Sequence, residues 1–140
     1  MRNLIDEIKS VCEKAIPDWG FYFDDRQLMN VKADNSVFPL VFFEEYRQGN
    51  YYVKHLIEKT TTVELYFCKL CQMHNEGTDR ESLRKQIEAE AVIPFIREYK
   101  ERLRIFTDID HFKFFTPPPR FDSNEVSIML QFNAKLVECL

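Results

Sequence analysis

The residues of this chain best suited to carry chemistry are Cys68, Cys71 and His74, which are evenly spaced. Thiolates and an imidazole are zinc ligands, and two cysteines separated by two residues are a common half of a zinc site. A structural site needs a fourth ligand, and the sequence holds no second pair of this kind. Within a strand, two thiols at an odd offset would also point to opposite faces. We expect Cys68 and Cys71 to be small core residues, with a structural zinc at the three positions as the alternative.

Paired acids are the second set of candidates, at Asp24-Asp25 and Glu44-Glu45. Adjacent residues of a strand face opposite ways, so Glu44 and Glu45 cannot converge on one substrate or metal. Asp24 and Asp25 fall in a polar segment that is typical of a loop, where charges are solvated. None of the three histidines has a serine or cysteine at a recognisable spacing. We therefore expect no catalytic residue, no cofactor and no enzymatic activity.

The composition is unusual in its aromatic residues, with 13 Phe, 6 Tyr and 1 Trp among 140 residues and only 3 Gly. Scarce glycine leaves no glycine-rich loop that could hold a phosphate. Aromatic side chains favour strands, and this many exceed what so small a core readily hides. A protein interface or a second covering layer from the chain itself would accommodate the excess. The candidate interface residues flank a predicted turn, lie on a strand with aromatics on both faces or follow a run of prolines: Tyr46, Tyr51, Tyr52, Phe115 and Phe121.

The charge balance argues against two classes of partner. The chain carries 19 basic and 23 acidic residues, a formal net charge of -4, without the basic excess of a duplex-binding domain. A basic cluster between Arg97 and Arg104 is interleaved with Glu98 and Glu101, as on a solvated helix face. No apolar run approaches the length of a membrane span, and the first residues do not resemble a signal peptide. We expect a soluble cytoplasmic protein with reduced cysteines that binds neither a membrane nor a specific nucleic-acid sequence.

Apolar periodicity predicts a single α+β domain over residues 1–140. We expect a mostly antiparallel sheet of about four to six strands, with an N-terminal helix and one long helix packed on one face. Every pairing is expected to be antiparallel or local. The predicted helices are 3–16, capped by Asn3 and closed by Pro17, and 79–104, kinked at Pro94.

The predicted strands include a hairpin that joins 37–46 to 51–59 through a turn at 47–50. The second strand of this predicted hairpin continues to residue 70, with a bend expected around 59–62. Period-two alternation is strictest over 126–136, where Val126, Ile128 and the following even residues share one face. Short strands are expected at 21–23 and 109–116.

Four stretches of the chain resemble the tail-terminator and tail-completion proteins of long-tailed bacteriophages and related prophages. The resemblance is one of pattern over most of the chain, and it lies in SVFPLVFFEEY (36–46), TTVELYFCKL (61–70), AVIPFIREYKERL (91–103) and EVSIMLQFNAKL (125–136). In that family an apolar strand opens with a Phe-Pro pair, a strand-turn and a long helix follow, and an alternating strand closes the chain. The prolines at 117–119 and Pro94 depart from the pattern.

The resemblance implies a non-catalytic structural subunit of a phage or prophage tail. Members of that family assemble as closed rings, commonly hexamers, that terminate the tail tube and join tail to head. The implied partners are further copies of the chain, the tail tube and the head–tail connector proteins. The chain would then be found in the cytoplasm during assembly and afterwards in the virion tail. A small soluble protein-binding domain, with zinc at Cys68, Cys71 and His74, is the alternative.

Overall fold

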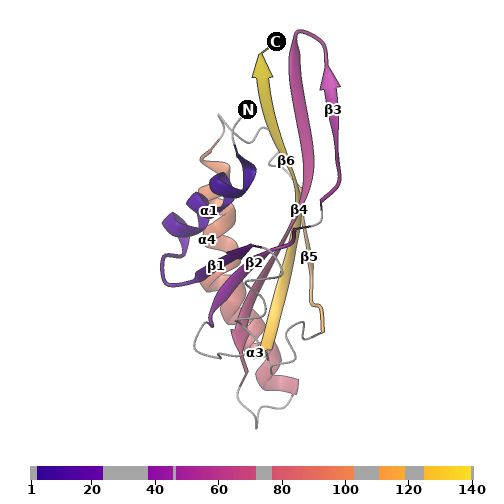
Figure 1. Cartoon of the computed structure of the whole chain (residues 1–140). Coiled ribbons are helices and arrows are strands. Elements are labelled where there is room, and N and C mark those ends of the chain that lie inside the picture. Colours follow the sequence, from indigo (N-terminus) through magenta and orange to yellow (C-terminus); the bar gives the residue numbers. More distant parts are fainter. Residues whose placement is uncertain are drawn as a thin grey trace.

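The computed structural model describes residues 3–23, 38–45, 47–71, 77–102, 111–118 and 125–139. These residues form an α+β fold in which helices lie beside one mixed sheet of six strands. Figure 1 shows the helices on the left of the sheet and two long strands that run the whole length of the molecule. The elements are α1 (Leu4–Ala15), β1 (Gly20–Phe23), β2 (Leu40–Phe43), β3 (Gly49–Val53), β4 (Leu56–Leu70), α3 (Gly77–Ile87), the π-helical η2 (Glu88–Val92), α4 (Ile93–Lys100), β5 (Phe112–Phe115) and β6 (Glu125–Cys139).

The sheet is built around the antiparallel pair β4 and β6, each 15 residues long. Its strand order is β1-β2-β4-β6-β5, and β3 pairs with β4 outside this path. Both β2 and β3 lie along the same edge of β4, where β2 is opposite residues 65–68 and β3 is opposite residues 57–61. The long strands therefore have different neighbours in their two halves.

One strand pair contradicts the expected topology. β1 and β2 are parallel, with Gly20 opposite Leu40, whereas we expected every pairing to be antiparallel or local. Residues 24–39 separate the two strands, and a connection of that length is enough for a crossover between parallel neighbours. The remaining pairs among the described strands are antiparallel.

The strand order also corrects the predicted hairpin. β2 does not pair with β3, and residues 49–53 are themselves a strand that turns back into β4 near Lys54 and His55. The break in the long apolar segment therefore lies at 54–55, whereas the bend was expected at 59–62. No glycine, proline or asparagine marks this turn, so the sequence carries none of the usual turn signals there.

The first helix and the last strand confirm their predictions. The Oδ1 atom of Asn3 accepts hydrogen bonds from the backbone N–H groups of Ile5 and Asp6, at 2.9 and 3.3 Å, and α1 ends at Ala15, before Pro17. In β6 the even residues from Val126 to Leu136 are all buried. Alternation of period two thus identified the core face of this strand correctly.

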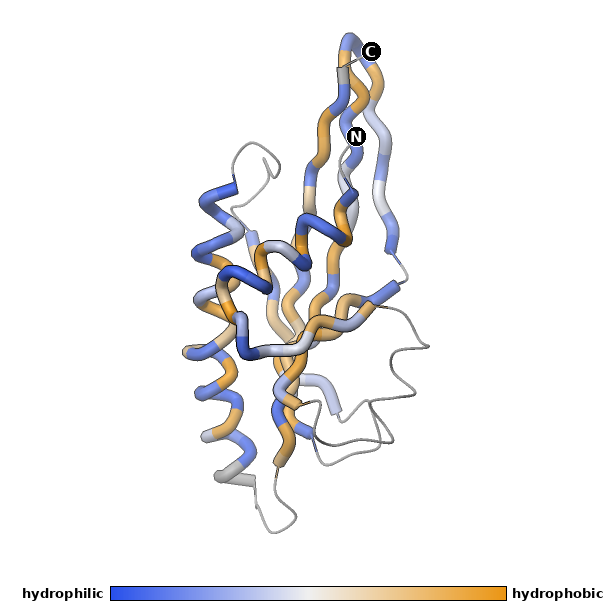
Figure 2. Tube along the Cα trace, turned by 60° about the vertical axis from the view of Figure 1, so that its left-hand side comes forward, coloured by the Kyte–Doolittle hydropathy of each residue, from blue (hydrophilic) through white to orange (hydrophobic). Residues whose placement is uncertain are grey.

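The main core packs residues of the helices against residues of the sheet. Phe95 of α4 has no exposed surface and its ring lies 5.7 Å from that of Phe67 and 5.9 Å from that of Phe132. Ile8 and Val11 of α1 join the same cluster. Figure 2 shows apolar segments of the helices turned toward the sheet. The aromatic excess is thus partly explained by a core built from rings.

The second helical run extends from Gly77 to Lys100 and includes a π-helical segment at 88–92. We expected an irregularity at Pro94, and the π-helical segment ends two residues before it. Proline lacks an N–H donor, and its ring crowds the carbonyl of the residue four positions earlier, which is Glu90. A wider turn relieves this crowding. No helix among the described residues is long and apolar enough to cross a membrane.

Candidate functional site

The most prominent surface feature is a three-stranded extension of the sheet, which we call the arm. It consists of β3, residues 56–61 of β4 and residues 134–139 of β6, which pair across all three strands. Figures 1 and 2 show the arm projecting beyond the helices, with the C-terminal end of β6 near its tip. The helices cover the arm only in part: Ala134 and Leu136 of β6 are buried in the main core, whereas β3 is exposed along its whole length.

Large apolar side chains are exposed on both faces of the arm. Tyr51 is 65% exposed, Tyr52 57% and Val53 62%. Tyr51 and Tyr52 are neighbours in β3, so their side chains lie on opposite faces. Leu56 and Val137 extend the exposed apolar surface on β4 and β6. An apolar cluster of this kind on a projecting element is typical of a protein-interaction site.

β3 is held against β4 by close backbone contact at the root of the arm. A Cβ atom on Gly49 would lie 1.9 Å from the carbonyl oxygen of Thr60, so only glycine fits at the start of β3. The N–H of Thr62 donates to the carbonyl of Gln48 at 2.8 Å. These contacts fix the direction in which the arm leaves the sheet.

Two pairs of charged or aromatic side chains cross the arm. The Lys59 ammonium lies 5.6 Å from the centroid of the Tyr51 ring, directly across the hairpin. On the other face, Lys135 Nζ lies 3.4 Å from Glu58 Oε1. The side chains of Lys135 and Glu58 are both about one-third exposed. Pairs of this kind add little stability, so the arm depends mainly on its backbone ladder.

A groove of about 530 Å³ lies between the arm and the start of α1. Its charged lining residues are Arg47 and Lys59. The Arg47 guanidinium carbon lies 5.5 and 5.3 Å from the ring centroids of Phe23 and Phe43, so this cation is already stacked on aromatic faces. No carboxylate, imidazole or thiol is among the described residues that line the groove. The groove can bind part of a partner, but it offers no pair of groups for acid–base chemistry.

A second aromatic surface lies on β5, at the opposite edge of the sheet. Phe114 is 71% exposed and Phe115 45%, and as neighbours in a strand they face opposite ways. Phe112 instead packs into the core, with its ring 5.6 Å from that of Tyr99. The exposed aromatics of the described chain thus lie on two elements at opposite edges of one sheet.

The predicted interface residues that the structure describes fall on these two surfaces. Tyr51 and Tyr52 lie on the arm and Phe115 lies on β5, so the structure separates them into two sites. Tyr46 and Phe121 lie outside the described residues. Sequence reasoning missed Leu56 and Val137 on the arm. Their only signal was an apolar residue near the end of a long strand, which in this chain more often marks the core.

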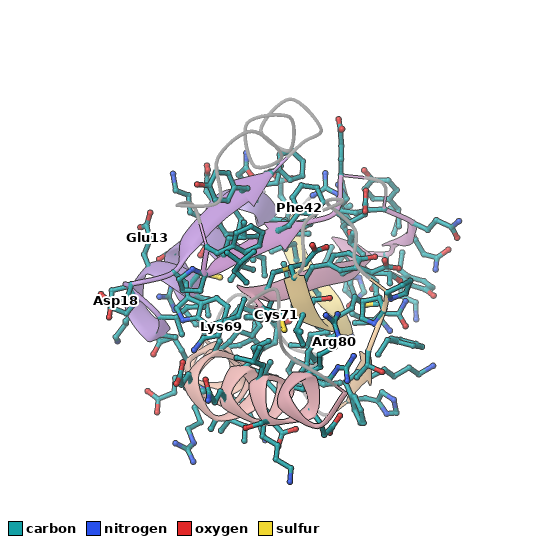
Figure 3. The ribbon with its side chains drawn as sticks, turned by 90° about the horizontal axis from the view of Figure 1, so that it is seen from below. Glu13, Asp18, Phe42, Lys69, Cys71 and Arg80 are labelled. Atoms are coloured by element: carbon teal, nitrogen blue, oxygen red, sulfur yellow. The ribbon has the colours of Figure 1, made fainter. Side chains whose placement is uncertain are left out.

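The candidate zinc ligands are not brought together by the part of the chain that is described. Cys68 belongs to a small cluster with Leu40 and Phe42, whereas Cys71 belongs to the main core. Figure 3 labels Phe42 of the small cluster and Cys71 of the main core. His74 lies outside the described residues. Within those residues no group of three histidine, cysteine or acidic side chains is placed to hold a metal ion.

Cys12, Cys68 and Cys71 are buried. Burial raises the pKa of the Cys12 thiol far above its ordinary value, and the nearby Glu13 carboxylate adds to the increase. Since the thiolate is the reactive form, Cys12 is chemically inert in the folded chain. Cys68 and Cys71 are also buried, as expected for small core residues.

Comparison with known proteins leaves the geometry as the main guide to function. No protein-family model matches the chain. No curated protein matches it either.

Proposed function

We propose that this chain is a non-catalytic structural subunit of a phage or prophage tail, where it forms a ring that terminates the tail tube and joins tail to head. The observation that carries the proposal is the arm, which exposes Tyr51, Tyr52 and Val53 without a covering layer. The sequence resemblance supplies the biological setting. The proposed partners are further copies of the chain, the tail tube and the head–tail connector proteins.

The position of the exposed surfaces supports assembly through two different contacts. The arm projects beyond the helices, and β3 and β5 lie at opposite edges of the sheet. A subunit with two distinct contact surfaces binds its neighbours head to tail. Such contacts form a closed ring when the rotation between neighbours divides a full turn evenly. The finer arrangement that we propose for the body, with both helices on one face of the sheet, leaves edges of the sheet available to neighbours.

The chemistry of the arm supports binding of a protein. Aromatic residues are enriched at the centres of protein interfaces, while charged residues are depleted there. β3 has the sequence Gly-Asn-Tyr-Tyr-Val and carries no charged residue. An isolated copy would leave these side chains in water, whereas assembly would bury them.

The proposal is tested by the mass of the protein in solution. Light scattering over a wide concentration range is run on the unmodified chain and on the Tyr51→Ser/Tyr52→Ser double variant. We expect the unmodified chain to form an oligomer that negative-stain images show as a closed ring, and the double variant to remain monomeric. Ile93→Ala is the matched control, because Ile93 is an exposed apolar residue on α4, away from the arm.

Two outcomes would contradict the proposal. A single-chain mass at every concentration would show that copies of the chain do not bind one another, and would favour the alternative of a small protein-binding domain. An oligomer that survives in the double variant but is lost in Ile93→Ala would place the contact on the helices. Mixing the ring with purified tail tubes then tests the setting, because a tail terminator must bind the end of the tube and stop its growth.

A further inference from the structure

The arm has two outer edges, and each ends the sheet as far as the structure describes it. β3 has β4 as its neighbour on one side. Residues 134–139 of β6 also have β4 as a neighbour, because β5 pairs with β6 only as far as Phe132. Strand edges present backbone N–H and C=O groups that can pair with another strand.

Within the described residues, β3 carries none of the usual protection of an edge strand. Natural sheets discourage pairing between molecules with lysine, proline or a bulge on an edge strand. β5 contains Lys113 and is soon followed by Pro117, whereas β3 contains neither residue type. Residues 134–139 of β6 include Lys135, but the Lys135 ammonium forms an ion pair with the Glu58 carboxylate within the arm. The composition of β3 is therefore that of an edge strand that pairs with a strand of another molecule.

The register places the two edges in line with each other. Tyr52 is opposite Glu58, and Glu58 is opposite Val137, so Tyr52 and Val137 stand at the same level. Because they lie two strands apart at one level, their side chains project from the same face. β3 and β6 also run in the same direction, since each is antiparallel to β4.

We propose that β3 of one copy pairs in parallel with residues 134–139 of β6 of the next copy, with Tyr52 beside Val137, so that the arms form one continuous sheet around a ring. This inference rests on the proposed function and specifies the contact that it requires. A level register involves no shift along the ring axis, so repeated contacts can close. A two-fold dimer would instead pair β3 with β3 in the antiparallel direction.

The side chains match in this register. Tyr52 meets the half-exposed Val137 on one face, whereas Tyr51 on the other face is level with Leu136, which is buried in its own copy. Val53, the last residue of β3, stands at the level of Glu138.

The exposed area is of the size that such a contact needs. With roughly 200 Å² for a full tyrosine side chain, Tyr51 and Tyr52 expose about 240 Å² between them. A stable interface buries about 800 Å² on each partner, so the two rings alone supply about 30% of one side. The remaining area would come from Val53, Leu56 and the paired backbone, which are also exposed on the arm.

Disulfide cross-linking tests this pairing. In a Cys139→Ser background, where the other three native cysteines are buried, we introduce Tyr52→Cys and Val137→Cys together. Within one chain these positions are separated by two strand spacings, about 10 Å, which is too far for a disulfide. Oxidation is therefore expected to join different copies, and a denaturing gel should show a ladder that stops at the ring size.

The single variants provide matched controls. Tyr52→Cys alone and Val137→Cys alone are expected to stay uncross-linked, while a mixture of the two should yield dimers and no longer species. Efficient cross-linking of Tyr52→Cys alone would show antiparallel pairing of β3 with β3 and would overturn the inference. An oligomer in light scattering without any ladder would overturn the pairing but leave the proposed function standing. A monomer at every concentration would overturn both.

Discussion

The body and the arm are built from the same two strands but are stabilised in different ways. In the body, Val63, Leu65 and Phe67 of β4 are fully buried beneath the helices. In the arm, the same strand becomes more exposed, and Leu56 near its tip is 39% exposed. Strand pairing is continuous through both regions, so the difference lies in what covers the sheet.

This difference separates folding from assembly. Buried rings stabilise the body through removal of apolar surface from water, a contribution that needs no second copy. The arm leaves Tyr51 and Tyr52 in water and gains that contribution only when another surface covers them. A substitution should therefore affect unfolding in the body and assembly in the arm.

The largest effect is expected for Phe95→Ala in the body. Phe95 is fully buried against Phe67, Tyr99 and Phe132, and its removal leaves a cavity among rings. We expect a loss of about 3–5 kcal/mol in the free energy of unfolding, measured by urea denaturation. Phe114→Ala is the matched control, because this ring is 71% exposed. Equal losses in the two variants would show that the body is not organised around this cluster.

A smaller and local effect is expected for Gly49→Ala at the root of the arm. The added methyl group would meet the Thr60 carbonyl at 1.9 Å, so β3 must shift away from β4. We expect destabilisation of about 1–3 kcal/mol confined to the arm. Hydrogen exchange should speed up in residues 49–61 and remain unchanged in α4. Slow exchange throughout β3 in this variant would contradict the close packing at Gly49.

A still smaller effect on folding is expected for Tyr52→Ala. Its ring is 57% exposed, so the free energy of unfolding of a dilute sample should change by no more than about 0.5 kcal/mol. The same variant should fail to assemble at concentrations where the unmodified chain forms rings. A large loss of stability in dilute solution would show that Tyr52 supports the fold of a single copy.

The smallest effect is expected for Glu58→Gln. The change removes the ion pair with Lys135, whose side chain is about one-third exposed like that of Glu58. Exposed pairs of this kind contribute about 0–1 kcal/mol, and salt screens them. Thermal unfolding of the variant should match that of the unmodified chain in 0.5 M salt. A loss well above 1 kcal/mol would mean that the arm depends on this pair.

The sequence predicted the parts of the fold that local patterns determine. Alternation from Val126 to Leu136 identified the core face of β6, and Asn3 identified the start of α1. It failed where the outcome depended on distant partners. This holds for the parallel pair β1 and β2, which residues 24–39 separate, whereas the local pairing of β3 with β4 was missed because its turn at 54–55 carries no turn signal.

Part of the candidate site could also be predicted from local patterns in the sequence. An excess of aromatic residues indicated an interface, and Tyr51 and Tyr52 were chosen because they flank a predicted turn. The predicted turn was displaced, yet both residues are exposed, because β3 lies beyond the helices. Alternation places Val137 on the face opposite to the even core residues of β6, but residue spacing carries no information on how far a helix extends over a sheet.

Hydrogen exchange at low and high protein concentration tests the central claim most directly, because it reads the arm and the body in one experiment. We predict that raising the concentration slows exchange in residues 49–53 and 134–139, whose outward amides become paired, and leaves α1 and α4 unchanged. Exchange rates in the arm that do not depend on concentration, while those of β5 or the helices do, would show that the arm is not where copies of this chain meet.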